Sequence, residues 1–335
     1  MKQLLKHREA VTVLGVVLLF ALVALVHPSF VSGGNLARIA NSTVILALLA
    51  AGSAIVIITR NIDVSVGSTL ALSGIVGGLL LRDGVPIVVA VLAVLALGAV
   101  LGAINGLGVT YGHVPSIVMT LGTLAAYRGI SFMITGGYSV ENIPSEYRQL
   151  GRLELLGLPV LVWGALLVLA GVALAMGRTR IGRHVYATGD NHGGAHLIGV
   201  RTNAVVIFAY AASGLLAAAA ALVFLAQIGS ISNQAGQGIE MRAIAAAVIG
   251  GVALTGGVGT IAGAVVGALF ITTATSSLSF LGIPGFWADT VIGAILLVAL
   301  FADARVRAAL DRRRLTDRYR ARHTVAPQLA ESEAR

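Results

Sequence analysis

The chain has 335 residues, of which 57% are hydrophobic and only 11% are charged. A soluble domain carries about 25% charged residues, so this composition excludes an ordinary soluble protein and predicts an all-α bundle of membrane-spanning helices. The absence of cysteine excludes disulfides, thiolate metal sites and cysteine nucleophiles. The formal net charge of +9 falls mostly in loops and in the C-terminal tail, which is the pattern of a membrane protein and not of a nucleic-acid-binding surface.

Lysine usage restricts the function further. The only two lysines are Lys2 and Lys6. A nucleotide-binding P-loop places a lysine on the β- and γ-phosphates, and neither of these residues lies in such a loop. We therefore expect no ATPase site and no cofactor in this chain, so that any ATP must be bound by another chain.

Apolar runs predict about ten membrane spans of roughly 20 residues each. They cover residues 11–26 and 36–59, a third run that ends near 81, then 86–109, 115–135, 159–176, 204–227 and 241–254, a ninth run that ends near 280, and 287–301. The spans make residues 1–301 one transmembrane domain. Residues 302–335 are expected to be a basic, partly disordered tail.

A polar break separates the second span from the third. It contains Arg60, Asn61 and Asp63, followed by Ser65. An isolated charge at membrane depth costs several kcal/mol unless it has a partner or water. Two compatible interpretations remain open: Asp63 and Ser65 cap the third span, or the break lines a solute path, as broken helix ends often do.

Glycines recur every four residues in two later stretches. One set is Gly98, Gly102 and Gly106, and the other is Gly259, Gly263 and Gly267. Such spacing leaves one smooth helix face, so it predicts close helix packing and not a phosphate-binding loop.

The fifth span, 115–135, is unusually polar. It contains Thr120, Thr123 and Arg128. A lipid-facing arginine is costly, so Arg128 should either snorkel or pair inside the protein, or face a water-filled path. Together with the residues of the break, the candidates for lining a path are Asn61, Asp63, Ser65, Thr120, Thr123 and Arg128.

A polar, basic stretch, residues 178–203, separates the sixth and seventh spans, and we call it the polar island. Apolar runs lie on both sides, so it must leave the bilayer. Two interpretations remain open: a short docking helix for a soluble partner, or a loop that is basic only because it fixes topology.

Local residues predict a turn, a short helix and a second turn in the polar island. Gly189 is expected to break the chain, and Asp190 or Asn191 to cap a helix over roughly 192–198. Gly199 lies where a helix C-terminal glycine belongs.

Histidines of the polar island do not predict a metal site. His192 and His196 lie four residues apart on one helix face, where two ligands could bind. No third ligand is in view, and the spans contain no pair of His, Asp or Glu at ligand or acid–base spacing.

Two short motifs suggest an internal repeat. Asp63-x-Ser-x-Gly67 and Gly236-x-Gly238-x-Glu240 each lead polar residues into an Ala/Gly-rich span. They lie five spans apart, and an odd shift inverts the orientation of the repeat, as in many transporters.

The positive charges predict the topology. With ten spans, both termini and the polar island share one side, which carries 17 of the 23 Lys and Arg residues. By the positive-inside rule that side is the cytoplasm. The arginines at 312–314 follow the last span directly, so they are expected to anchor the tail at lipid headgroups.

Four sequence blocks resemble the permeases of ribose-type ABC sugar importers. They are NIDVSVGS at 61–68, PSIVMTLGTLAAYRGI at 115–130, YATGDNHGGAHLIGV at 186–200 and GQGIEMRAIAAAVIGGVALTGGVGTIAGAVVGA at 236–268. Within the family, the pieces TRNIDVSVGS, YATGDN, GVRT and the N-Q-x-G-x-G-x-E-M run at 233–241 are most similar to permeases for autoinducer-two, with rhamnose-type permeases next.

The resemblance implies a multi-pass permease subunit of the cell inner membrane, with both termini cytoplasmic. Its implied partners are a cytoplasmic ABC ATPase, a second permease subunit, identical or paralogous, and a periplasmic solute-binding protein. The implied substrate is a small sugar-like molecule, either autoinducer-two or a pentose or deoxyhexose such as ribose or rhamnose.

The family's coupling helix falls on the polar island, and its residues here are Gly189, Asp190, Asn191, Ala195, Gly199 and Val200. Asp190 stands where many relatives have glycine. The alternative function is a proton-coupled secondary transporter, for which Asp63 is the one candidate titrating carboxylate.

Overall fold

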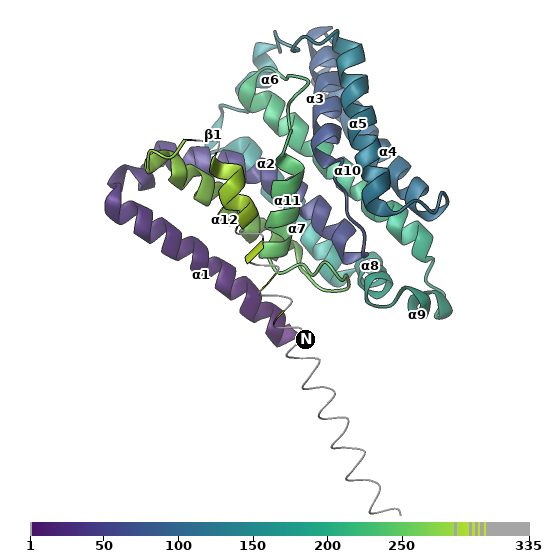
Figure 1. The fold of residues 1–335 in the computed structure, drawn as a ribbon. Helices are drawn as coiled ribbons and strands as arrows, with labels where there is room; N and C mark the ends of the chain where they lie inside the picture. The colour runs from purple at the N-terminus through teal and green to yellow at the C-terminus, as the bar shows by residue number, and fades with distance from the viewer. Residues whose placement is uncertain (1, 285–286, 295–296, 299–300, 302–304, 306–335) are drawn as a thin grey trace, which may run out of the picture. The chain divides into compact units, whose positions relative to one another are not determined.

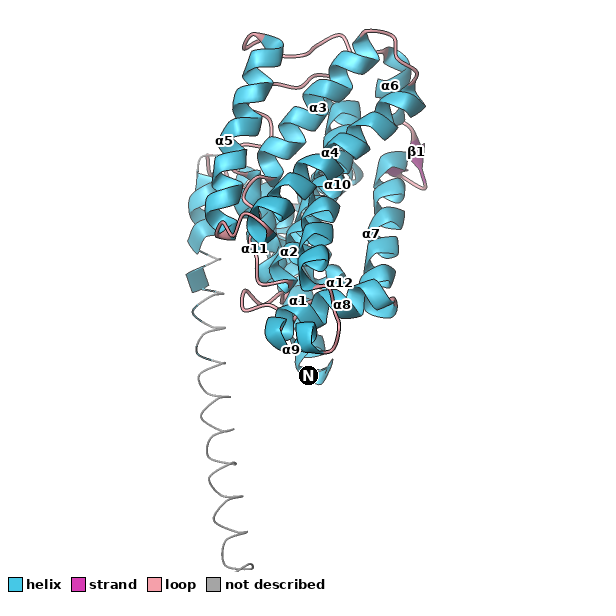
Figure 2. Cartoon of the chain, turned by 90° about the vertical axis from the view of Figure 1, so that its right-hand side faces the viewer, coloured by secondary structure: helices cyan, strands magenta, loops and turns pink. Residues whose placement is uncertain are grey.

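A computed structural model describes residues 2–284, 287–294, 297–298, 301 and 305. The chain divides into two compact units, residues 1–288 and 289–335. The first unit is built almost entirely of helices, with one two-stranded hairpin (Figure 1). Figure 2 shows the same helices and the small hairpin from the side. The expected all-α fold is thus confirmed.

The elements follow in chain order. They are α1 (Lys2–Val26), the 3₁₀ helix η1 (Pro28–Val31), α2 (Gly33–Ile58), α3 (Val66–Arg82), α4 (Ile87–Thr110), α5 (Ser116–Thr135), α6 (Ser145–Leu150), β1 (Glu154–Leu155), β2 (Leu158–Pro159), α7 (Val160–Arg178), α8 (Arg180–Asp190), α9 (His192–Leu197), α10 (Thr202–Ile228), α11 (Ile239–Ile249) and α12 (Ile261–Phe280).

Six of these helices, α2, α4, α5, α7, α10 and α12, are long and apolar enough to cross a bilayer. The apolar part of α1, Ala10–Val26, and α3 are shorter. The run predicted as an eighth span, 241–254, is instead the 11-residue helix α11, about 16 Å long at 1.5 Å per residue. That is about half of the hydrocarbon core.

The C-terminal predictions fall largely outside the described residues. Of the predicted tenth span, residues 287–294, 297–298 and 301 are helical, and the others are not described. The tail over 302–335 lies outside the described residues apart from Arg305. The count of ten spans, the tail and its arginine anchor therefore remain predictions.

Two helices, α2 and α10, form the centre of the first unit. They contact each other, α4 and α3 pack against α10, and α12 and α11 pack against α2. The two helices that pack on the same central helix also contact each other, α3 with α4 and α11 with α12. If α2–α4 and α10–α12 are two copies of one repeat, the first helix of each copy packs against the other two helices of the second copy. This two-fold arrangement supports the predicted inverted repeat.

The first glycine seam joins α4 to α10. A Cβ atom on Gly98 would collide with the carbonyl oxygen of Gly214, and one on Gly102 would collide with that of Tyr210. A Cβ atom on Gly106 would press on the backbone of Ile207. The predicted seam is therefore confirmed, and the two backbones touch because no side chain separates them.

The second seam closes α11 against α12. Cβ atoms on Gly263 and Gly267 would collide with the carbonyl oxygens of Gly250 and Ala246. Gly259 lies just before α12, with a φ of +143° and Val252 beside it. The second seam is confirmed at Gly263 and Gly267, whereas Gly259 lies in the loop before the helix and not on its face.

Replacement of Gly102 by alanine should destabilise the bundle. Its methyl group has no space against the Tyr210 carbonyl, and overpacking of this kind costs roughly 1–3 kcal/mol. Thermal unfolding in detergent, followed by size-exclusion chromatography, measures the loss. Gly164→Ala is the matched control, because nothing lies within 4 Å of a Cβ atom there. Equal melting of the two variants would contradict the seam.

Candidate functional site

The break between α2 and α3 is non-helical backbone among membrane helices, so its polar groups need partners inside the protein. Asp63, which is 2% exposed, is the partner of one backbone N–H and of two side-chain hydroxyls. Its Oδ1 accepts hydrogen bonds from Ser65 N at 3.0 Å and Ser65 Oγ at 2.7 Å. Its Oδ2 accepts one from Ser213 Oγ of α10 at 3.0 Å. The carboxylate therefore joins the start of α3 to α10.

The network continues into α4 and α5. Asn105 Nδ2 donates to Ser65 Oγ at 2.8 Å, and Thr123 Oγ1 donates to Asn105 Oδ1 at 2.7 Å. These three side chains are buried, as is that of Asp63. Asp63, Ser65 and Thr123, all predicted as path residues, lie in this one network, and Asn105 and Ser213, which were not predicted, belong to it as well. The signal for Asn105 was present, since it is the one amide side chain in the apolar run 86–109.

The peptide groups of Ile62 are satisfied from two other helices. Its carbonyl accepts a hydrogen bond from Tyr210 Oη of α10 at 3.1 Å and a longer one from Thr120 Oγ1 of α5 at 3.4 Å. Its N–H donates to Ser116 Oγ at 3.4 Å. Asn61, which is half-buried, donates from Nδ2 to both oxygens of Thr59 at 3.1 Å. The break is thus tied to α5 as well as to α4 and α10.

The capping interpretation needs one correction. Ser65 is the N-cap residue of α3, but its side chain makes no capping hydrogen bond. Its hydroxyl is already used by Asp63 and Asn105. Asp63 instead fixes the N-cap backbone, because it accepts from the Ser65 N–H. Whether these residues also line a solute path remains a prediction.

A second break, residues 229–238, lies between α10 and α11, and Arg128 satisfies its backbone. The guanidinium donates from Nη1 to the carbonyl oxygens of Asn233 at 2.6 Å and Ala235 at 2.8 Å. Thr135 Oγ1 donates to Asn233 Oδ1 at 2.9 Å, and Ile231 pairs with Val140 through two backbone hydrogen bonds. Arg128 therefore pairs inside the protein and does not snorkel. Its role in a path remains a prediction.

The two breaks meet at a pair of glycines. A Cβ atom on Gly67 would collide with the Gly236 carbonyl oxygen and with a carboxylate oxygen of Glu240. A Cβ atom on Gly236, whose φ is +71°, would press on the Gly67 carbonyl. The two motifs that suggested an internal repeat therefore lie in direct contact.

The polar island forms two helices, α8 and α9, and not one. Thr179 caps α8 by accepting from Gly182 N at 3.3 Å, and Asn191 caps α9 by accepting from Gly194 N at 2.9 Å. The expected chain break at Gly189 was wrong, because this residue lies inside α8. The cap is Asn191 and not Asp190. Gly199, with a φ of +85°, ends the segment as predicted.

Gly189 belongs to a helix because it is a contact point. A Cβ atom there would collide with the Ile58 carbonyl oxygen at the end of α2 and approach Gly257 N. Arg60 Nη2 donates to the Asp190 carbonyl at 2.6 Å. Gly257 N in turn donates to the Ile58 carbonyl at 2.9 Å. The end of α8 is therefore fixed to the first break.

The same helix is fixed to the loop that joins α11 to α12. Tyr186 Oη donates to the Gly259 carbonyl at 2.8 Å. A Cβ atom on Gly256 would press on both Arg60 and the Gly189 carbonyl. The end of α2 and the loop before α12 therefore both contact one short helix, α8.

Exposure separates the predicted coupling residues into two groups. Asp190, Asn191 and Gly199 are exposed, whereas Gly189, Ala195 and Val200 are buried and hold the segment in place. Two strongly exposed apolar side chains of the polar island were not predicted as coupling residues: Leu197, at 87% exposed, and Ile198, at 78%. Their signal was two consecutive large apolar residues within a polar segment. No three His, Asp or Glu side chains of the described residues gather into a metal-binding group.

Comparison with known proteins decides the class of this assembly. A family model described as "Branched-chain amino acid transport system / permease component" matches residues 35–300. The chain is 44% identical to the Autoinducer 2 import system permease protein LsrC of Escherichia coli (strain K12 / DH10B), over 98% of this chain and 96% of the relative. The chain belongs to this permease family. No solved structure gives a significant match.

Other relatives agree over the same length. The LsrC protein of Shigella flexneri is 44% identical over 98% of this chain and 96% of its own. That of Salmonella typhi is 43% identical over 100% of this chain and 96% of its own. The expected ABC importer permease is confirmed: this permease is a multi-pass inner-membrane subunit that works with an ATPase and a solute-binding protein. The comparisons do not support a proton-coupled transporter.

Removal of the Asp63 carboxylate should cost the permease stability. Asp63→Ala leaves the Ser65 amide and the Ser213 hydroxyl without their partner, and each buried unpaired group costs roughly 1–3 kcal/mol. Asp63→Asn keeps an acceptor oxygen and should stay close to the original protein. Melting in detergent compares the three proteins. Asp83→Ala, at an exposed ion pair with Arg82, is the control. An Asp63→Ala protein as stable as its control would contradict the structural role.

Proposed function

We propose that this permease imports autoinducer-two or a closely similar small polyhydroxylated molecule. The observation that carries the proposal is the 44% identity to an autoinducer 2 import permease over 98% of the chain. Identity spread over the whole chain covers every helix that a solute would meet. A pentose or deoxyhexose such as ribose or rhamnose is the next substrate class.

We infer that α8 and α9 couple the permease to its ATPase. Leu197 and Ile198 supply an exposed apolar tip, and the exposed Asp190 and Asn191 lie beside it. A buried apolar contact rimmed by polar groups is the usual form of a protein interface. Movement of the tip reaches both repeats, because α8 contacts the end of α2 and the loop before α12. Packed helices then switch between discrete arrangements.

Orientation and partners follow from charge. We propose that both termini and the polar island face the cytoplasm, where the ATPase lies, because that side carries most of the basic residues. The solute-binding protein would then dock at the other end, on the segment 136–158 with α6 and the hairpin. Tyr147 anchors this segment, since its buried hydroxyl donates to the Leu222 carbonyl at 2.9 Å. A second permease subunit completes the path.

The predicted path residues divide by burial. Asp63, Ser65, Thr120 and Thr123 are buried, so we propose that they keep the first break in shape. Asn61 and Arg128 are half-buried, and we propose that these two are the ones a passing solute can reach. Weak contacts suit this task, because a tightly bound solute would leave slowly.

Polar substitutions at the tip should uncouple transport. Removing the apolar contact of Leu197 and Ile198 loses about 1.5–3 kcal/mol for each buried side chain, so Leu197→Ser with Ile198→Ser should lower uptake more than tenfold. The measurements are uptake by reconstituted transporter and ATPase activity stimulated by solute. Tyr111→Ser, 66% exposed just after α4 and outside both proposed docking surfaces, is the control. Full uptake by the double variant would refute the coupling role.

Competition decides the substrate. The complete transporter in proteoliposomes, with its ATPase and binding protein, should accumulate autoinducer-two only with ATP. Unlabelled ribose and rhamnose should compete weakly. Leucine should not compete, although the family model is named for branched-chain amino acids. Preferential uptake of leucine or of ribose would overturn the proposed substrate while leaving the transporter class intact.

A further inference from the structure

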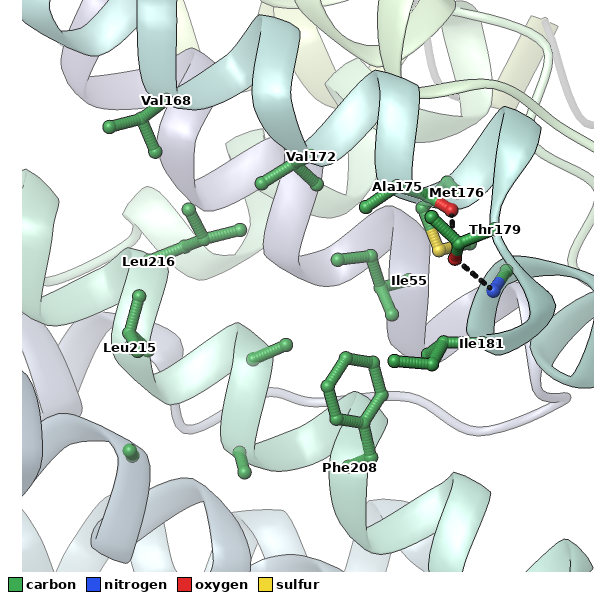
Figure 3. Close-up of a pocket in the computed structure, with 14 residues that line it drawn as sticks. Ile55, Val168, Val172, Ala175, Met176, Thr179, Ile181, Phe208, Leu215 and Leu216 are labelled. Carbon is green, nitrogen blue, oxygen red and sulfur yellow. Dashed lines mark hydrogen bonds between the residues drawn. The ribbon is translucent and has the colours of Figure 1, made fainter.

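An apolar cavity of about 380 Å³ lies between α7 and α10, beside the site already described. Figure 3 shows aliphatic and aromatic side chains pointing into it from both helices, with Ile55 of α2 at the back. Residues that line it include Val168, Val172, Met176, Phe208, Leu215 and Leu216.

The cavity offers water almost nothing to bind. The one hydroxyl in its lining, that of Thr179, already donates to the Ala175 carbonyl at 2.7 Å and accepts from Gly182 N. A space needs several polar partners before ordered water fills it. Both walls, α7 and α10, are helices long and apolar enough to cross a membrane. The matching occupant is therefore hydrocarbon from the bilayer.

A second hollow of about 410 Å³ adjoins the first, and the two share Ile181 and Phe208. Its lining adds two polar side chains, His184 of α8 and Arg201 at the start of α10. Both are exposed, and among the described residues neither side chain has a hydrogen-bond or ion-pair partner. The groove thus begins between apolar walls and ends at a cationic mouth.

Charge around the mouth points to an anionic headgroup. From 156 to 238 the chain has four arginines, Arg178, Arg180, Arg183 and Arg201, and one acidic residue, Asp190. The mouth is lined by α8 and the start of α10 and adjoins the polar island, which must leave the bilayer, so we place it near the lipid headgroups. Arginine binds phosphate through charge-assisted hydrogen bonds, and basic pockets between membrane helices bind anionic lipids.

We propose that this groove binds an anionic phospholipid, with one acyl chain between α7 and α10 and its headgroup phosphate on Arg201 beside His184. The inference rests on the cavity and its mouth, and it does not depend on the identity of the solute. Ile181 and His184 belong to α8, so the lipid joins the coupling segment to α7 and α10. Anionic lipid should then stabilise the permease more than zwitterionic lipid does.

The test uses the purified full-length permease in detergent, titrated with phosphatidylglycerol or phosphatidylcholine. Retained lipid is counted by native mass spectrometry, and melting is measured in parallel. We expect tighter retention of phosphatidylglycerol, and roughly five- to tenfold weaker retention after Arg201→Gln, because a charged hydrogen bond is lost. Arg152→Gln, an exposed arginine at the opposite end, is the matched control and should retain lipid normally.

A second variant tests the groove itself. Ala212→Phe places a ring in the cavity lining, so it should release both lipids to the same degree. If this variant does not fold, Arg201→Gln still decides. Equal retention of the two lipids, or no effect of Arg201→Gln, would overturn the proposal.

The absence of cysteine in the chain allows a direct check of who occupies the groove. A single cysteine introduced by Phe208→Cys, at the boundary of the two hollows, should stay monomeric under oxidation and be protected by added phosphatidylglycerol from a maleimide. A disulfide-linked dimer would show that a second copy of the chain covers the groove, and that result also overturns the lipid site.

Discussion

Satisfaction of backbone polar groups inside the bilayer is the constraint on which the rest of this structure depends. Helices satisfy themselves, but the two breaks at 59–65 and 229–238 cannot. In each break one charged side chain bonds part of the backbone, and neighbouring helices satisfy other groups, as Tyr210 and Thr120 do for the Ile62 carbonyl. Asp63 accepts from the N–H and hydroxyl of Ser65, and Arg128 donates to two carbonyls of the second break. The sign of each charge fits its partners, because a carboxylate accepts hydrogen bonds from N–H and O–H groups and a guanidinium donates them to carbonyl oxygens.

These two side chains also connect distant helices, because Asp63 accepts from Ser213 of α10 and Arg128 of α5 donates to the break that follows α10. The helices α2 and α10 fill the centre, and each receives the other repeat's shorter helices. Glycine removes the side chains wherever backbones must touch, at Gly102 against α10 and at Gly67 against Gly236. Because these backbones are in direct contact and close-packed interiors transmit strain, a small shift of one group of helices should displace the other.

We propose that the partner ATPase acts on this core through one helix, α8. The contacts of α8 run to Ile58 and Arg60 on one side and to Gly257 and Gly259 on the other. Movement of α9 should therefore displace both the end of α2 and the loop before α12. The proposed lipid contacts α8 through Ile181 and His184, which line the groove. We propose that this lipid holds α8 in place while the ATPase acts on the exposed tip formed by Leu197 and Ile198.

Much of this molecule could be read from residue order alone. Long apolar runs identify the membrane helices because a span needs about 20 residues, and the four-residue glycine spacing identifies the seams. The partners of Asp63 could not be read. Ser213 and Asn105 are single polar residues in apolar helices, and only the fold shows that they converge. Gly189 was misread because a glycine that ends a helix and one that admits a neighbour look identical in a sequence.

The amino-acid sequence by itself determined the membrane class, because composition is a property of the chain, and its four sequence blocks indicated the permease family by their resemblance to known members. Only the tertiary structure decided that Asp63 and Arg128 serve the breaks, that α8 joins both repeats, and that an apolar groove opens beside it. Those features arise between residues far apart in the chain, where local propensity carries no information.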